Sequence, residues 1–439
     1  MAAAAGSLEA RGLGPGDRVA FCVASSADLL CAVLGASLVG IVPVVLSAQL
    51  LEAEREALLA DADAAHQVLD GTALGDLFTG PTTELAALPL TRPMLFTSGT
   101  TGHPKGVTVG VWSEAQAAAV FDDERSVWHF DETDVHLVNS PLHHSVATRF
   151  AAGTLLSGGE VILTSHFDAP VVLDLLRSGS LTTTFLAPAH LQRLFDCGAL
   201  GVDETFEGLR FVAHAGAPCP APLKRAAIER FGAEALVEFY GSTEGQFTVC
   251  STPEWLERPG TVGRARAGRR LFLGPLDDEA GEQPDGVGTI WCEAPSFARF
   301  EYFGDPMSTS WAWAGDAFSV GDLGRLDEAG YLFLSGRRSD LIITGGVNVY
   351  PAEIEEVLGH LVGVLEVCAF GLDDERWGQR VCVAVVGAPG LRPADVADHA
   401  AATLAPFKRP KEIHLVTELP VGPTGKVLRR ALPGLLGVA

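Results

Sequence analysis

The sequence has few basic residues for its length, and this shortage excludes some classes of partner. Lys and Arg number 31 against 55 Asp and Glu, so the formal net charge is −24. A surface this acidic repels phosphodiester backbones and anionic lipids. We therefore expect neither a nucleic-acid partner nor stable membrane association. A small anionic ligand is still compatible with the sequence, because it needs only a local positive site.

Cysteine pairs with metal-binding or redox spacing are also absent. The eight cysteines are scattered, with no C-x-x-C pair and no His/Cys cluster at zinc spacing. Such cysteines are typical of small buried side chains in a reducing compartment. The Ala-rich N-terminus lacks the basic stretch and cleavage site of a signal peptide. We expect a cytoplasmic protein.

One long segment, residues 29–47, carries no charge at all. Gly35, Gly40 and Pro43 interrupt it, and the residues from Pro43 onward have the pattern of a strand. A core helix followed by a buried strand is therefore a better interpretation than a membrane-spanning helix.

The composition is that of a globular protein with more than one domain. The 439 residues allow about two to four domains, and 47% of them are hydrophobic. Strand-like and helical stretches alternate near the N-terminus and again after Gly106, which is typical of a mostly parallel sheet covered by helices. The helices expected after Gly106 include residues 111–120, 169–177 and 221–231. Residues 260–334 contain short strands between Gly, Pro and Asp turns and indicate a β-rich subdomain. A helix at 351–361, followed by two strands, predicts a compact α+β unit.

The strongest local signal is a loop rich in glycine and hydroxyl groups at residues 97–106. A strand end is followed by six small or hydroxylated residues, from Thr97 to Gly102, and then by Lys105. Glycines let several backbone N–H groups point at one anion, and the lysine adds a full positive charge. The spacing is not that of a Walker A loop. The loop therefore predicts a polyphosphate site, and a flexible surface loop is the alternative.

Five motifs in order carry a family resemblance. Residues 97–106 resemble the phosphate-binding signature of the adenylate-forming superfamily, which comprises acyl-CoA synthetases, aryl-acid ligases, luciferases and peptide-synthetase adenylation domains. The other four motifs are Tyr240-Gly241-Ser242-Thr243-Glu244, Gly321-Asp322-Leu323-Gly324, Gly336-Arg337-Arg338-Ser339-Asp340 with Gly345, Gly346 and Glu353 after it, and Pro423-Thr424-Gly425-Lys426. The resemblance covers almost the whole chain and is nearest to the acyl-CoA synthetases.

The resemblance implies a site for ATP and Mg²⁺. Tyr240 would stack on adenine, Asp322 would accept the ribose hydroxyls, Glu244 would bind Mg²⁺ and Thr243 would donate to the α-phosphate. Taken alone, Tyr240 could be a core residue and Asp322 a solvated turn residue. The expected nucleotide-binding residues are Thr97, Ser98, Gly99, Thr100, Thr101, Gly102, Gly216, Ala217, Pro218, Glu238, Phe239, Tyr240, Gly241, Ser242, Asp322 and Arg337.

The catalytic residues expected from the resemblance are Lys426, Lys105, Thr243, Glu244 and His144. A lysine between an attacking carboxylate and the α-phosphate cancels their repulsion and stabilises charge on phosphorus. Lys426 would have this role in the first half-reaction. His144 matches a family position beside the acyl carboxylate, although it could instead be a satisfied core histidine.

The resemblance also implies two domains joined by a hinge. We expect an α/β protein in which residues 1–336 form a large N-terminal domain of stacked, mostly parallel sheets with helices, including the β-rich subdomain, and shortened at its N-terminus. Residues 337–340 would be the hinge, with Ser339 as pivot where the family usually has Asp or Lys. Residues 341–439 would be a mobile α+β C-terminal domain, with Gly345 and Gly346 at the thiol tunnel.

The acid predicted for this site lacks an α-amine. Peptide-synthetase adenylation domains place an aspartate early in the pocket, whereas the residues directly after Pro141, 142–150, contain no carboxylate here. The expected acyl-pocket residues are Ser145, Val146, Thr148, Phe150, His214, Ala215, Phe247 and Thr248. Coenzyme A is the expected thiol. Loading of an acyl carrier protein, a single half-reaction, and a binding protein with an inactive site are the alternatives.

Overall fold

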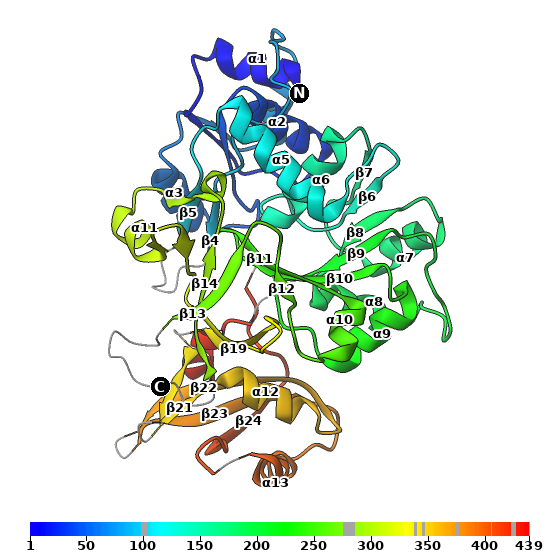
Figure 1. The fold of residues 1–439 in the computed structure, drawn as a ribbon, viewed down its shortest axis with the longest axis vertical. Helices are drawn as coiled ribbons and strands as arrows, with labels where there is room; N and C mark the ends of the chain where they lie inside the picture. Colours follow the sequence, from blue (N-terminus) through cyan, green and yellow to red (C-terminus); the bar gives the residue numbers. More distant parts are fainter. Residues whose placement is uncertain are drawn as a thin grey trace.

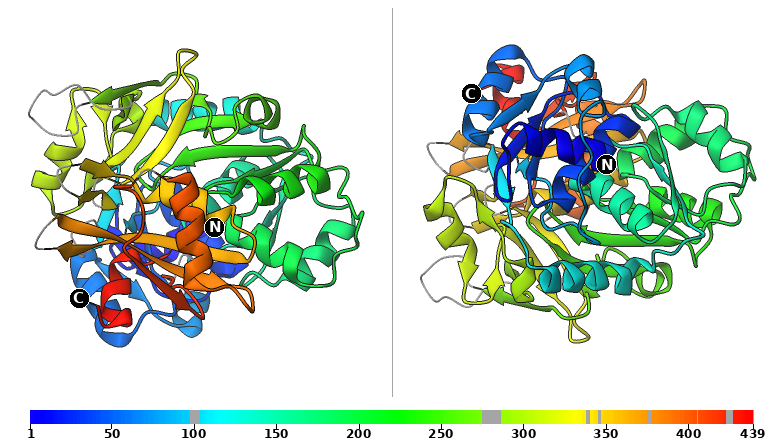
Figure 2. Two further views of the ribbon diagram at one scale, coloured as in Figure 1. Left: turned by 90° about the horizontal axis from the view of Figure 1, so that it is seen from below. Right: turned by 90° about the horizontal axis from the view of Figure 1, so that it is seen from above.

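The computed structural model describes residues 1–97, 104–274, 286–337, 340–344, 347–374, 377–404, 406–422 and 427–438, without the side chains of 337, 343, 347 and 348. Five β-sheets with flanking helices form the structure (Figure 1). Figures 1 and 2 show α12, α13 and the strands β22–β24 at one end of the molecule, with α1 and α2 at the opposite end.

A small parallel sheet lies near the N-terminus. Its strand order is β2-β1-β3, and Val19 of β1 pairs with Pro43 on one side and His66 on the other. The charge-free segment 29–47 is a helix, α2, followed by the buried strand β2, as the sequence predicts. Ser26 caps α2 by accepting a hydrogen bond from the backbone of Leu29 at 3.1 Å. The elements of this part are α1 (Ala2–Ala10), β1 (Arg18–Phe21), α2 (Ala27–Leu38), β2 (Val42–Val45), α3 (Glu52–Ala62), β3 (His66–Val68) and α4 (Gly71–Asp76).

The largest sheet has seven strands in the order β12-β11-β10-β9-β8-β6-β7. The strands from β7 to β10 are parallel, and the chain then reverses into the antiparallel β11 and β12. One face packs against α7, α8 and α9, and the other faces α5 and α6. The elements are α5 (Glu114–Trp128), β6 (Val135–Val138), α6 (Ser145–Leu156), β7 (Glu160–Leu163), α7 (Ala169–Arg177), β8 (Thr183–Phe185), α8 (Pro188–Asp196), β9 (Phe211–His214), α9 (Ala221–Phe231), β10 (Leu236–Gly241), β11 (Gln246–Ser251), α10 (Thr252–Glu257) and β12 (Arg264–Ala265).

Short antiparallel strands dominate the region that the sequence marks as β-rich. The six-stranded sheet has the order β16-β17-β14-β18-β19 with β13 beside β14. A separate small sheet has the order β15-β5-β4, in which β4 precedes the phosphate loop and β5 follows it. Their bounds are β4 (Leu95–Thr97), β5 (Lys105–Thr108), β13 (Arg270–Gly274), β14 (Gly288–Glu293), β15 (Glu301–Tyr302), α11 (Pro306–Ala312), β16 (Trp313–Ala314), β17 (Ala317–Phe318), β18 (Asp322–Leu326) and β19 (Leu332–Arg337), with a short 3₁₀ helix at Ser296–Ala298.

The C-terminal part is a five-stranded sheet with helices, and it has a core of its own. Its strand order is β21-β20-β23-β22 with β24 parallel to β23, and α12 and α13 pack on it. The elements are β20 (Ile342–Thr344), β21 (Val347–Val349), α12 (Pro351–Gly359), β22 (Val364–Asp374), β23 (Gly378–Gly387), α13 (Pro393–Thr403), β24 (Glu412–Val416), a 3₁₀ turn at Arg429–Ala431 and α14 (Leu432–Leu436). The expected α/β class, with a large N-terminal and a small α+β C-terminal part, is confirmed.

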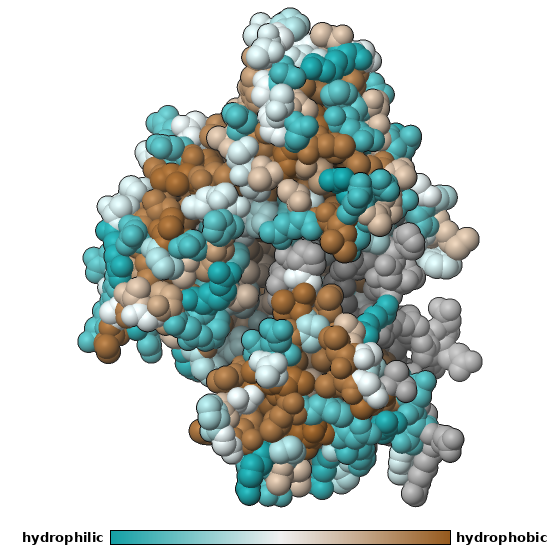
Figure 3. Space-filling model, turned by 180° about the vertical axis from the view of Figure 1, so that it is seen from behind, coloured by the Kyte–Doolittle hydropathy of each residue, from teal (hydrophilic) through white to brown (hydrophobic). Residues whose placement is uncertain are grey.

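The surface is hollowed between these two parts, as the view from behind shows (Figure 3). Searched over the described ranges, no helix is both long and apolar enough to pass through a lipid bilayer. The segment 29–47 is therefore buried in the N-terminal core, where Leu29, Val33 and Ile41 are almost fully covered.

Candidate active site

Asp322 and Tyr240, the residues expected at the ribose and the adenine, are 82 positions apart in the sequence and in contact in the structure. The Tyr240 hydroxyl at the end of β10 donates to Oδ2 of Asp322, the first residue of β18, at 2.6 Å. The Tyr240 ring stacks on Phe247 with centroids 4.8 Å apart, and both Tyr240 and Asp322 are buried. In the strand register Asp322 lies opposite Arg337, whose side chain is outside the described part. The seven-stranded and six-stranded sheets therefore contribute one residue each to this half of the site.

The adenine loop predicted at Gly216-Ala217-Pro218 directly follows the carboxyl end of β9. Gly216 adopts a φ of 91°, a left-handed conformation that disfavours residues with a Cβ. Behind this loop, the buried Glu238 of β10 forms an ion pair with Lys224 of α9. Burial raises the pKa of Glu238, and the charge of Lys224 opposes that rise. The Glu238 carboxylate is thus already paired with a lysine of the protein. The next residue, Phe239, points to the opposite face of the sheet.

Glu244 lies in the turn between β10 and β11, beside Ser242 and Thr243. The Tyr302 hydroxyl donates to its Oε1 at 2.9 Å, and only 6% of the residue is exposed. Among the side chains that the structure describes, no group of three or more His, Cys, Asp or Glu could hold a metal by itself. This fits Mg²⁺, which binds one or two protein carboxylates together with phosphates and water. The Ser242 Oγ is buried and finds no hydrogen-bond partner within the described chain.

Lys105 is held at the start of β5, directly after the phosphate loop. Its Nζ lies 3.3 Å from Oδ2 of Asp305, 5.2 Å from the centre of the Tyr302 ring, and within hydrogen-bond reach of Ser308 Oγ. Asp305 caps α11 by accepting from the backbone N–H of Ser308 at 2.9 Å, and hydrogen bonds from Ser308 lower the pKa of Asp305. The sequence reasoning missed Asp305, Ser308 and Tyr302, because no local pattern marks a turn residue as the partner of a lysine 200 positions away.

Two histidines precede α6 at the carboxyl end of β6. The His143 and His144 rings lie 4.3 Å apart, and His144 is the N-cap position of α6. Burial lowers the pKa of His143, so this side chain is uncharged at neutral pH. His144 thus lies where the chain passes from β6 into α6, at the edge of the sheet where the nucleotide residues also lie.

The structure brings only some of the predicted acyl-pocket residues together. Val146, Phe150 and Ala215 pack with the aromatic side chains between α6 and the sheet. His214 lies opposite Glu238 in the register and, like Val212, points to the α9 face. It is fully buried, neither ring nitrogen has a partner within the described residues, and burial holds its pKa well below its usual range.

The remaining predicted pocket residues already have internal contacts. Phe247 stacks on Tyr240, and the Thr248 hydroxyl donates to the carbonyl of Val262. Thr148 donates to the carbonyl of Ser145 at 3.2 Å. Phe247 and Thr248 thus make their contacts away from the space beside α6, toward the β-rich region of the chain.

Several other predicted site residues lie outside the described part of the chain. The set comprises Ser98, Gly99, Thr100, Thr101 and Gly102 of the phosphate loop, Ser339, Gly345, Gly346 and Lys426. Thr97 is described as the last residue of β4, and it pairs with Lys105.

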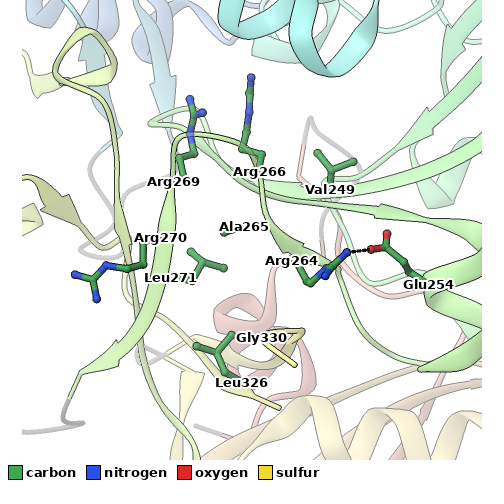
Figure 4. A pocket seen from close by; sticks show the side chains of 10 residues that line it. All are labelled: Val249, Glu254, Arg264, Ala265, Arg266, Arg269, Arg270, Leu271, Leu326 and Gly330. Atoms are coloured by element: carbon green, nitrogen blue, oxygen red, sulfur yellow. Dashed lines mark hydrogen bonds and ion pairs between the residues drawn. The ribbon is translucent and has the colours of Figure 1, made fainter. Parts of the chain in front are cut away.

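A larger pocket of about 570 Å³ lies elsewhere, among β11–β13 and the β18–β19 hairpin (Figure 4). Four arginines line it, and each is paired with a carboxylate: Arg264 with Glu254, Arg266 and Arg269 with Asp123, and Arg270 with Glu293. Figure 4 shows Arg266 and Arg269 pointing away from the centre of the pocket. None of the predicted site residues lines this pocket.

The fold and the nucleotide half of the site define an adenylate-forming ligase. The chain belongs to the AMP-binding enzymes: the family model described as "AMP-binding enzyme" matches residues 1–87 and 92–300, and "AMP-binding enzyme C-terminal domain" matches residues 353–426.

Two curated relatives and three solved structures illustrate the match. The chain is 30% identical to a fatty acid–[acyl-carrier-protein] ligase, ScoC, of Streptomyces coeruleorubidus, over 97% of this chain and 88% of the relative. It is 28% identical to the long-chain-fatty-acid–CoA ligase FadD13 of Mycobacterium tuberculosis, over 97% of this chain and 89% of that ligase.

Among solved structures, ATP-bound MatB from Rhodopseudomonas palustris matches with a TM-score of 0.86 and 28% identity, over 99% of this chain and 92% of that one. The o-succinylbenzoate CoA synthetase MenE of Bacillus subtilis, in complex with ATP and a magnesium ion, matches with a TM-score of 0.84 and 25% identity, over 98% and 92%. Apo MatB matches with a lower TM-score of 0.74.

Proposed function

We propose that the chain is an AMP-forming acid–thiol ligase that makes an acyl-CoA from a carboxylic acid without an α-amine. The observation that carries this proposal is the assembled nucleotide half-site, in which Tyr240 binds Asp322 and Tyr302 orients Glu244 beside Lys105. The names of FadD13 and MenE support coenzyme A as the acceptor.

The first half-reaction joins the acid to AMP. A carboxylate oxygen of the acid attacks the α-phosphorus of ATP, the bond to the β-phosphate breaks, and pyrophosphate leaves. Asp322 holds the ribose, Thr243 donates to the α-phosphate, and Lys426 lies between the two reacting anions. Mg²⁺, held by Glu244, would neutralise charge on the phosphates when bound. Lys105, at the base of the phosphate loop, adds a second positive charge.

The second half-reaction transfers the acyl group to the thiol. The sulfur attacks the acyl carbonyl carbon, the bond to AMP breaks, and the thiol proton is released. We propose that residues 341–439 rotate about the hinge 337–340 between the two steps, with Ser339 as pivot and Gly345 and Gly346 at the thiol tunnel. The better match to ATP-bound than to apo MatB supports a domain arrangement suited to the first step.

The start of α6 supports an acid without an α-amine. The first turns of this helix, Ser145–Arg149, contain no carboxylate that could hold an ammonium. All eight cysteines are free, which supports a reducing compartment and thus the cytoplasm as the place of action.

A second candidate function is the loading of an acyl carrier protein, and the name of ScoC favours it. The test uses the full chain with a panel of acids and measures two products separately: pyrophosphate, and thioester on either coenzyme A or a phosphopantetheinyl carrier protein. We expect both pyrophosphate and acyl-CoA. Thioester on the carrier with little turnover on coenzyme A would replace the proposal by the carrier-loading function. Pyrophosphate without any thioester would leave only the first half-reaction.

A further inference from the structure

The space between α6 and the seven-stranded sheet is the place where an acid would have to enter. The adenine loop follows β9, Tyr240 ends β10, and His143 and His144 follow β6, so all of them lie at the carboxyl ends of parallel strands. From this edge, the space beside α6, which packs directly on β6, is a path along which the acyl group of a bound acid could extend. The size of this space therefore limits the acyl group.

Aromatic side chains fill the space. We call them the ring cluster: Trp128, Phe130, Phe150, Phe185, Phe211 and Phe239. Phe150 of α6 is fully buried at its centre, with ring centroids 4.7 Å from Trp128 and 5.6 Å from Phe211. The cluster draws its rings from α5, α6 and the strands β8, β9 and β10, so every wall of the space contributes one.

A buried histidine closes the inner side of the cluster. The His136 ring stacks on Phe150 at 5.5 Å with an interplanar angle of 11°, and its Nδ1 lies 2.9 Å from Thr183 Oγ1. The hydrogen bond fixes the orientation of His136, and the stacked ring in turn fixes Phe150. Phe150 therefore cannot swing toward β6 without breaking a buried polar contact.

Among the described residues, a very small cavity borders the ring cluster. Its volume is about 10 Å³, close to that of one water molecule, and its walls include Asn139, Ser140, Val146 and Phe185. Asn139 and Ser140 are at the end of β6, and Phe185 and Val146 form the side nearest the ring cluster. The cavity thus borders the ring cluster through Phe185 and Val146, and the rings occupy the space beyond these two side chains.

We propose that the ring cluster restricts this enzyme to short-chain carboxylic acids of the size of acetate, propionate or butyrate, and that Phe150 sets the limit. The proposal rests on the proposed function, since it names the acid activated at the same site. Longer aliphatic acids and aryl acids need the volume that Phe150 and its neighbours occupy.

The test measures pyrophosphate release by the full chain with acetate, propionate, butyrate, hexanoate, octanoate and benzoate. This readout does not depend on which thiol accepts the acyl group. We expect kcat/KM to fall by about tenfold or more for each methylene beyond butyrate, the usual discrimination of a closed apolar pocket. Phe150→Ala and the milder Phe150→Leu should raise the octanoate-to-propionate ratio of kcat/KM by at least about tenfold.

Two further variants keep the test decisive. Phe185→Leu enlarges the cavity from the strand side and should shift the same ratio if the Phe150 variants do not fold. Phe231→Leu removes a similar volume on the α9 face of the same sheet, where Phe231 packs with Phe206 at 5.5 Å, and should leave the ratio unchanged.

Parental preference for octanoate or benzoate over propionate would overturn the size limit. The size limit would also be overturned if the Phe150→Leu and Phe185→Leu variants fold and keep the parental octanoate-to-propionate ratio, as is expected of Phe231→Leu. If the enzyme releases no pyrophosphate with any of these acids, the outcome is a different one, because it rejects the proposed function itself.

Discussion

At the scale of single residues, Asp322 carries the clearest predicted role. Its carboxylate is buried and held by the Tyr240 hydroxyl at 2.6 Å, in a position to accept ribose hydroxyls. Asp322→Ala removes a charged acceptor worth about 1.5–3 kcal/mol, so we expect ATP to bind about 10- to 150-fold more weakly by calorimetry.

The matched control is Asp316→Ala, which removes an exposed aspartate from the same β-rich region and should leave the affinity for ATP unchanged. Tyr240→Phe keeps the carboxylate but loses its positioning hydroxyl, and should weaken ATP less than Asp322→Ala. Equal ATP affinity in the parent and in a folded Asp322→Ala variant would remove Asp322 from the ribose site.

His136 should make stability depend on pH. Burial lowers the pKa of its imidazole to about 3, with a smaller contribution from Arg210. Below the ordinary histidine pKa of about 6.5 the unfolded chain takes up a proton that the folded chain refuses, so the free energy of unfolding falls as the pH drops from about 6.5 toward 3. The slope for one such group is about 1.4 kcal/mol per pH unit.

His136→Gln removes this group, and its unfolding free energy should therefore fall less steeply between pH 6 and 4, measured by urea denaturation. His190 and His214, whose pKa values burial also lowers, remain in the variant and keep part of the slope. His360→Gln at an exposed position is the control and should reproduce the parental slope. A parallel pH dependence of His136→Gln and parent would contradict the buried, neutral state of His136.

At the scale of elements, a buried ion network fastens α5 to the segment after β12. Arg266 contacts Asp123 at 2.9 Å and Glu124 at 3.2 Å, and its side chain is 1% exposed. It also donates to Gln246 at the start of β11, two residues after Glu244. The network thus joins the helix that carries Trp128 to the strand that leaves the nucleotide turn.

Arg266→Ala should lower the free energy of unfolding by about 3–5 kcal/mol, because it leaves two carboxylates with reduced compensation in a buried site. Arg264→Ala is the control: its ion pair with Glu254 at 2.9 Å is solvent-exposed and should be worth about 1 kcal/mol or less. Chemical denaturation of both variants measures the two free energies of unfolding. Similar decreases in the two variants would show that the network adds no more stability than a surface ion pair.

Much of the element pattern could be predicted because it is local. Residues 169–177 and 221–231 form the predicted helices with the same bounds, and the charge-free segment is the helix and strand expected. The helix expected at 111–120 begins at Glu114 and continues to Trp128, since Ser113 and Gln116 form a capping box that fixes its start. The helix α6 was not predicted, because the segment after His144 was interpreted only by its polar chemistry.

The site residues that belong to sequence motifs could be predicted. The side chains that contact them from distant parts of the sequence could not. Tyr240 and Asp322 come from separate motifs and do meet, whereas Tyr302 reaches Glu244 across 58 positions without any motif. The acyl pocket was the least predictable part. Strand alternation decides which face a side chain occupies, and a shift of one residue separates Ala215 from His214.

At the scale of the whole molecule, an apolar contact joins the two parts. Leu341 and Tyr350 of the C-terminal part pack against Val287 and Leu323 of the β-rich sheet. Contacts between domains of one chain can separate at moderate cost, which is compatible with the proposed rotation of the C-terminal part between the half-reactions.

The half-reactions should therefore separate at Lys426, which lies outside the described residues. In the proposed mechanism its ammonium acts only while the adenylate forms, so Lys426→Ala should lose pyrophosphate release by roughly 10²–10³-fold or more. The same preparation, given acyl-adenylate and coenzyme A, should make thioester at close to the parental rate. Loss of both activities together would assign Lys426 to both steps or to structure, and loss of neither would exclude it from adenylation.

The hydrogen bond from Tyr240 to Asp322 has a consequence for how the protein unfolds. It adds a buried polar contact between two sheets that also share an apolar cluster, in which the Phe247 and Phe318 rings lie 5.0 Å apart, and a nucleotide bound there would touch both. A ligand that binds only the native state adds about 2.7 kcal/mol at a concentration 100 times its Kd. Nucleotide should therefore make the two sheets melt as a single cooperative unit, and cellular ATP would act as a folding ligand for this chain before it acts as a substrate.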